Sequence, residues 1–117
     1  MNGADDDPDH PIPSLSGLDF VAKKRAGGAD LGIVIAAPLN ADERSQRRLI
    51  DKLELYLRFI ASPEFQAEFG TPDPSNTSVV VTIHTGSHPA IFELLDRCQP
   101  WAAQNRAALV VERRPAT

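Results

Sequence analysis

The chain has too few cysteines to be held together by disulfides or by a cysteine-bound metal. Its 117 residues contain one cysteine, Cys98, which excludes an intramolecular disulfide and a structural site built on several thiolates. A lone thiol is typical of a reducing interior, so we expect a cytoplasmic protein. A chain of this length buries about two thirds of the surface of its unfolded form. A hydrophobic core can therefore stabilise it without such links.

Long hydrophobic runs are also missing. The longest nearly unbroken apolar run covers residues 31–39, about half of the ~18 residues that suggest a membrane span. The first residues are acidic, and no apolar segment follows them. We therefore expect neither a signal peptide nor a membrane partner.

The chain carries no excess of basic residues. Sixteen acidic residues against twelve basic ones give a net charge of −4, and the four aspartates among the first nine residues account for this whole imbalance. Because nucleic-acid binders concentrate positive charge on one face, we expect no nucleic-acid partner. Arginine outnumbers lysine nine to three, which indicates a GC-rich bacterial genome.

The N-terminal segment differs in composition from the rest. Residues 1–16 combine acids and prolines with almost no apolar side chains, so they cannot offset the entropy cost of ordering. We predict a disordered acidic tail at residues 1–16, a single α/β domain at residues 17–114 and a frayed C-terminus at residues 115–117.

Four segments have the pattern of β-strands. Alternation at residues 18–23, the glycine pair at residues 27–28 and the apolar run at residues 31–37 predict a β-hairpin. The β-branched residues 79–84 are typical of a buried strand, and residues 108–112 form the last one. A glycine pair can also cradle phosphate, but here it opens a strand rather than a helix.

Helical patterns lie between these strands. Asn40 with Glu43 matches a capping box, and a stripe at helical spacing follows it: Leu49, Leu53, Tyr56, Leu57 and Ile60. Ser62 followed by proline predicts a short separate helix at residues 63–69. A further helix starts near Pro89, and Pro100 should kink or break it close to Cys98.

The resulting order, ββαβαβ, predicts an α+β two-layer sandwich. In it a four-stranded mixed sheet packs against two main helices. Helices between successive strands imply right-handed crossovers, so strands two, three and four should be parallel, with the first antiparallel to the second. A ferredoxin-like arrangement is the alternative. The order of the strands in the sheet is left open.

Part of this sequence resembles a family of uncharacterised bacterial domains of similar size. The resemblance lies in residues 49–62, which contain the pattern K-L-x-x-Y-L-x-F-I, and in the strand at residues 18–22 with the turn and apolar strand after it. Together these segments cover roughly half of the chain. Because the family is a domain of unknown function, the resemblance implies the order of elements but no catalytic residue.

Polar side chains follow the second and third predicted strands. Ligands of parallel sheets collect at the carboxyl ends of the strands, and the residues expected there are Asp42, Glu43, His84, Thr85, Gly86, Ser87 and His88. Backbone N–H groups at Gly86 and Ser87 could bind an anion, and the histidines could bind a divalent metal. Alternatively, Ser87 or His88 caps the next helix and His84 ends a strand at the surface.

Catalysis has little support in the sequence. Ser87 lacks the G-x-S-x-G spacing of a nucleophile elbow. Cys98 lies on the apolar stripe of its helix, where a raised pKa and an inert core role are expected. We expect no cofactor.

A second candidate surface consists of apolar residues outside the main helical stripe. These are Leu55, Phe59, Phe65 and Phe69. Leu55 and Phe59 need another cover, which either the second helix or a partner chain can supply. The leading hypothesis is a non-enzymatic module that binds another protein or itself through this surface. The alternative is a small-molecule, anion or metal site at the His84–His88 loop, including a hydrolase.

Overall fold

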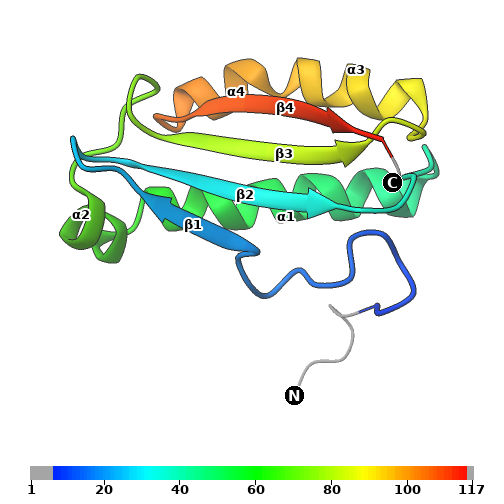
Figure 1. The fold of residues 1–117 in the computed structure, drawn as a ribbon, viewed down its shortest axis with the longest axis horizontal. Helices are drawn as coiled ribbons and strands as arrows, with labels where there is room; N and C mark the ends of the chain where they lie inside the picture. Colours follow the sequence, from blue (N-terminus) through cyan, green and yellow to red (C-terminus); the bar gives the residue numbers. More distant parts are fainter. Residues whose placement is uncertain (1–6, 116–117) are drawn as a thin grey trace.

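The structure is a computed structural model that describes residues 7–115, so residues 1–6 of the predicted tail and residues 116–117 of the predicted frayed end lie outside it. In chain order the elements are β1 (Phe20–Lys23), β2 (Ala29–Ile35), α1 (Glu43–Ile60), α2 (Pro63–Phe69), β3 (Ser78–His84), α3 (Pro89–Arg97), α4 (Gln99–Gln104) and β4 (Ala108–Arg114) (Figure 1). The predicted α+β fold with a four-stranded mixed sheet is confirmed. None of the helices in the described part is long and apolar enough to cross a membrane.

The topology of the sheet leaves one of its faces uncovered. The strand order is β1-β2-β3-β4, with β1 antiparallel to β2 and the other two pairs parallel. The predicted strand directions are thus confirmed, and three adjacent parallel strands rule out the ferredoxin-like alternative. Both crossovers advance across the sheet in the same direction, and right-handed connections of that kind place their helices on one face. In the described part of the chain the opposite face therefore has no second layer.

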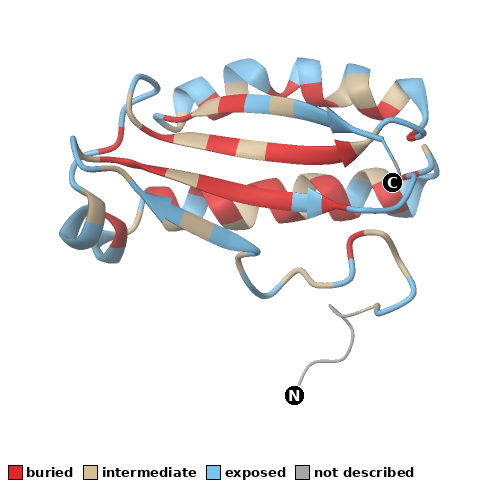
Figure 2. Cartoon of the chain, viewed as in Figure 1, coloured by how far each residue is buried: buried red, intermediate tan, exposed pale blue. Residues whose placement is uncertain are grey.

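The core lies between the sheet and the helices. The strands contribute alternate residues to it, namely Leu31, Ile33, Ile35, Val79, Val81, Ile83 and Leu109. The predicted stripe of α1, from Leu49 to Ile60, is buried against them. Figure 2 shows the buried parts of α1, β2 and β3 facing one another. Every second residue of the strands and the residues at helical spacing on α1 therefore pack together in one apolar layer.

Tyr56 ties α1 to the sheet through a buried hydroxyl group. Its Oη donates to the carbonyl of Gly32 and accepts the N–H of Asp19, both at 2.6 Å. Burial raises the pKa of Tyr56 to about 12. The phenol therefore stays protonated and keeps both hydrogen bonds throughout the physiological pH range.

The start of α1 differs from the prediction. Asp42 rather than Asn40 is the capping residue, because its carboxylate accepts the N–H of Ser45 at 3.2 Å. The expected capping box with Glu43 is therefore wrong. The physical reason lies in Leu39, which is fully buried and whose backbone is bonded to the loop after β3, so the chain stays extended past residue 40.

The other predicted helix boundaries are confirmed. Ser62 caps the short helix α2 by accepting the N–H of Phe65 at 3.1 Å, and Gly70 ends it at a positive φ of 87°. The third predicted helix is broken at Cys98 into α3 and α4. Pro100 lies in the first turn of α4, where its missing N–H has no helical partner to lose.

Residues 7–17 form a strap that lies along α1. Ile12 is 1% exposed and belongs to the core. Arg48 donates through Nε and Nη2 to the carbonyl of Ile12 at 2.9 and 2.7 Å, and Lys52 donates to two further strap carbonyls at 2.8 and 2.9 Å. In the structure, one buried aliphatic side chain and two basic residues of α1 thus hold a segment whose own composition favours disorder.

Candidate functional site

The loops after β2 and β3 meet at the carboxyl edge of the sheet, as parallel neighbours require. The Leu39 N–H donates to Ser87 Oγ at 3.0 Å, and the His88 N–H donates to the Leu39 carbonyl at 2.9 Å. The Thr85 N–H donates to the carbonyl of Arg114 at 3.1 Å, which attaches the same loop to the end of β4. Three strand ends are thus joined at one edge.

Within this loop the two histidines stabilise local backbone turns. His84 Nδ1 accepts the N–H of Gly86 at 2.8 Å, and His88 Nδ1 accepts the N–H of Ala90 at 3.0 Å as the cap of α3. With Nδ1 used as the acceptor, the neutral ring carries its proton on Nε2. His88 is therefore the cap of α3, one of the two alternatives expected from the sequence. In both histidines Nδ1 is already occupied by a backbone N–H, so it is not free to bind a ligand.

The acidic residues of the predicted site do not join the histidines. Asp42 is engaged as the cap of α1, and its hydrogen bonds from Ser45 lower the pKa of its carboxyl group. Glu43 lines a separate hollow on the outer side of α1, together with Arg47 and Leu94. Among the described residues no three or more histidine, cysteine or acidic side chains are grouped so that they could hold a metal ion.

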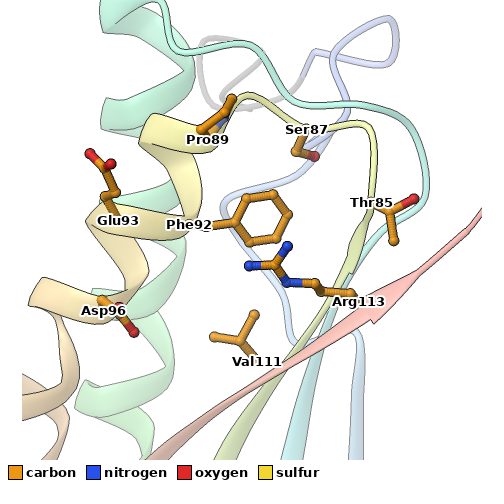
Figure 3. A pocket seen from close by; sticks show the side chains of 8 residues that line it. All are labelled: Thr85, Ser87, Pro89, Phe92, Glu93, Asp96, Val111 and Arg113. Carbon is orange, nitrogen blue, oxygen red and sulfur yellow. The ribbon is translucent and has the colours of Figure 1, made fainter.

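A hollow of about 510 Å³ opens next to the predicted loop, between α3 and β4. Of the predicted residues only Thr85 and Ser87 line it. Its most distinctive feature is a stacked pair, in which the guanidinium carbon of Arg113 lies 4.0 Å from the ring centroid of Phe92. Figure 3 shows this guanidinium group beneath the ring and facing the hollow. Since Arg113 has no carboxylate partner among the described residues, the hollow presents one oriented cation.

Sequence reasoning missed this pair, although the sequence holds a signal for it. Arg113 has the same parity as Leu109 and Val111, and strand alternation places residues of one parity on one face. Because Leu109 is buried under the helices, an arginine two positions beyond Val111 points to the same side. What the sequence could not supply is that Phe92 of α3 lies opposite it.

The predicted contact surface on α1 and α2 is largely covered. Phe65 has no exposed surface, so a partner cannot reach it. Its ring centroid lies 5.6 Å from that of Phe59 and 4.8 Å from that of Phe69, which makes the three rings one cluster between α1 and α2. Leu55 lines a shallow depression together with Leu15 of the strap. The cover of this surface comes from within the chain, but α2 and the strap supply it.

The largest exposed apolar side chains lie elsewhere, on the uncovered face of the sheet. Phe20 and Val34 are each 45% exposed and Val110 is 38% exposed. Phe20 is paired across the strands with Gly32, Gly32 with Val80, and Val80 with Val110. Phe20, Gly32, Val80 and Val110 therefore form one row across the sheet. Val34 lies two residues after Gly32 in β2 and so points to the same face. We call Phe20, Val34, Val80 and Val110 the sheet patch.

Gly32 makes room for the largest member of the sheet patch. A Cβ atom at this position would lie 1.7 Å from Cε1 of Phe20, so only glycine lets the ring lie flat on the strand. At one end of the patch are Asp30 and Ser78, and at the other end Thr82 is paired with Glu112. The patch is thus an apolar centre with a polar rim.

One arrangement of serine, histidine and aspartate occurs at the start of α1, but its hydrogen bonds oppose catalysis. Ser45 Oγ donates to Asp42 Oδ1 at 2.8 Å and lies 2.9 Å from His10 Nε2. Because His10 Nδ1 accepts the N–H of Ile12 at 2.9 Å, the proton of the ring is on Nε2 and points at the serine. A general base needs a lone pair there. Ser45 is also only 4% exposed.

No protein-family model, curated protein or solved structure matches this chain, so the resemblance to the uncharacterised bacterial domains stays a prediction.

Proposed function

We propose that this protein is a non-enzymatic binding module whose contact surface for another protein chain is the sheet patch. The observation that carries the proposal is that the three most exposed large apolar side chains of residues 7–115, Phe20, Val34 and Val110, gather on a single sheet face. Scattered exposed hydrophobic residues are normal on any protein, but a contiguous group with a polar rim is typical of interaction sites.

The function proposed here is the protein interaction expected from the sequence, but the contact surface lies on the sheet instead of on α1 and α2. Leu55, Phe59, Phe65 and Phe69 are engaged with one another or with the strap, and burying them further gains little. Within the described residues, no segment covers Phe20, Val34 and Val110 in this way. Transfer of apolar surface from water contributes about 25 cal/mol per Å², so the free energy available for binding is larger on the sheet.

The sheet patch can be tested by introducing charge on it. We expect Val34→Lys and Val110→Lys to weaken binding of a partner, or self-association, by at least about tenfold, because an interface on this apolar patch would have to desolvate the new charge. Sedimentation velocity of the purified chain measures self-association. Quantitative mass spectrometry of proteins captured by each variant measures other partners.

The matched control is Leu55→Lys, which places the same charge on the surface predicted from the sequence. Its binding should equal that of the wild-type chain. If binding survives both valine substitutions but is lost in Leu55→Lys, the interface lies on α1 and not on the sheet patch. A monomeric wild-type chain that captures the same proteins as Val110→Lys would refute the proposal.

The stacked arginine favours a second candidate, a site for a small anionic ligand at the hollow beside α3. Arg113 is held over Phe92 with its guanidinium N–H groups available, and Thr85 and Ser87 line the same hollow. Guanidinium groups bind carboxylates and phosphates through two parallel hydrogen bonds. Glu93 and Asp96 also line the hollow. Their negative charges repel an anion, which makes this second function the weaker candidate.

Titration with inorganic phosphate and with acetate, followed by ¹⁵N chemical shifts, tests this second site. We expect millimolar anion to shift the amide signals of residues 85–87 and the Arg113 side-chain signal, because they surround one hollow. Arg113→Gln should abolish the shifts, whereas Arg106→Gln, on a separate hollow, should leave them unchanged. Shifts of equal size in both variants would show screening by salt rather than a site.

A further inference from the structure

His10 is the fastening point of the strap that can change its charge near neutral pH. Its ring bridges the strap and α1, since Nδ1 accepts the N–H of Ile12 and Nε2 lies 2.9 Å from Ser45 Oγ. The serine hydroxyl passes the hydrogen bond on to Asp42, the cap of α1. The docked strap therefore uses the neutral ring with its proton on Nε2.

Protonation of this ring would break the arrangement. A proton on Nδ1 would face the Ile12 N–H, so an acceptor would become a second donor. The new positive charge would also lie in the field of Arg44 and Arg48 of α1, opposed by the carboxylates of Asp7 and Asp42. Ile12, the apolar anchor of the strap, is only two residues away.

We propose that the strap is a pH-operated latch, closed over α1 while His10 is neutral and released when His10 takes up a proton. Release withdraws Ile12 from the core. It also uncovers Arg48 and Lys52, which are 5% and 2% exposed when the strap is docked. The latch is independent of the sheet patch, so each can fail in experiment without the other.

The electrostatics of the docked strap act in the required direction. Burial of the ring, followed by the positive charges of Arg48 and Arg44, lowers the pKa of His10 below its ordinary value of 6.5. A released strap then binds more protons than a docked one, so docking is weakened as the pH falls. The stabilising contribution is complete above pH 6.5 and is lost as the pH falls through the lowered pKa. Asp7 pairs with Arg44, and its lowered pKa keeps it charged through this range.

Amide hydrogen exchange of the full chain between pH 7.5 and 5 tests the latch. After correction for the intrinsic exchange rate, we expect Ile12 and its strap neighbours to lose protection progressively below pH 6.5, while the amides of β3 keep theirs. The His10 ring signals should titrate over the same range. A His10 pKa at or above 6.5, or protection of Ile12 that is unchanged at pH 5, would overturn the proposal.

The substitution His10→Asn separates the ring's charge from its hydrogen bond. Asparagine Oδ1 can accept the N–H two residues ahead, as Nδ1 does here, but it does not titrate. We expect Ile12 in this variant to stay protected at pH 5. His84→Asn replaces a histidine that makes the same local hydrogen bond at the far loop, and should keep the wild-type pH response. Loss of protection at pH 5 in His10→Asn that matches the wild-type loss would refute the latch.

Discussion

Replacing Lys52 with alanine should lower the free energy of unfolding by about 2–4 kcal/mol, because it removes one partner of a buried ion pair. The ammonium group donates to the carbonyls of Ser14 and Gly17 at 2.8 and 2.9 Å and lies 3.1 Å from Asp19 Oδ1. All three of its N–H groups are therefore in use. Asp19 is 31% exposed at its side chain, so water partly compensates it, and the loss stays below that of a fully buried pair. Urea denaturation measures the change.

Two further variants identify the source of this loss. Lys52→Met keeps most of the aliphatic stem, so its effect isolates the charge and the hydrogen bonds. Arg58→Met removes an ion pair with Glu54 whose side chains are 76% and 46% exposed, and should cost less than about 0.5 kcal/mol. Addition of Asp19→Asn to Lys52→Met should recover part of the loss, since the uncompensated carboxylate is gone. Equal effects of Lys52→Met and Arg58→Met would contradict the structure.

Replacing Gly28 with alanine should cost about 2–5 kcal/mol, the sum of a positive-φ penalty and a backbone collision. Gly28 has φ of 82°, and a Cβ there would lie 2.1 Å from the carbonyl oxygen of Asn76. The colliding atom belongs to the backbone of the segment before β3, so it cannot rotate away. Thermal and urea denaturation measure the loss.

Gly27→Ala is the matched control for this prediction. Gly27 also has a positive φ, 101°, but the nearest atom to a Cβ at this position is the Phe69 carbonyl oxygen at 3.8 Å. It should therefore show only the conformational penalty, about 1–2 kcal/mol. Equal losses in the two variants would mean that the segment around Asn76 moves aside, and that the hairpin turn is not anchored there.

Features of the fold that depend on neighbours in the sequence could be predicted. The stripe from Leu49 to Ile60 required a helix with one buried face. Ser62 and Pro63 started α2, and Pro100 divided the last helical region. Strand directions followed as well, because a helix between two strands of one sheet forces a right-handed parallel crossover. Asn40 was mistaken for the cap of α1 because the burial of Leu39, which delays the helix, depends on the loop after β3.

The candidate sites were predicted less well because they depend on which elements become neighbours. Alternation showed that Phe20 and Val21 point to opposite faces, but it could not show which face has a cover. That was decided by the strand order, which puts both crossovers on one side and leaves the sheet patch exposed. The pairing of Arg113 with Phe92 required the same knowledge. The resemblance of residues 49–62 to a family of unknown function indicated a fold and no site.

The sequence by itself determined the secondary structure, the direction of each strand and the helix face that is buried, since these follow from spacing, capping and backbone sterics within a few residues. Tertiary structure alone decided that the acidic strap lies on α1 and that one sheet face is left open. Both depend on contacts between segments far apart in the chain: Ile12 finds its apolar pocket, and Arg48 and Lys52 find their carbonyl partners, only after α1 has packed on the sheet.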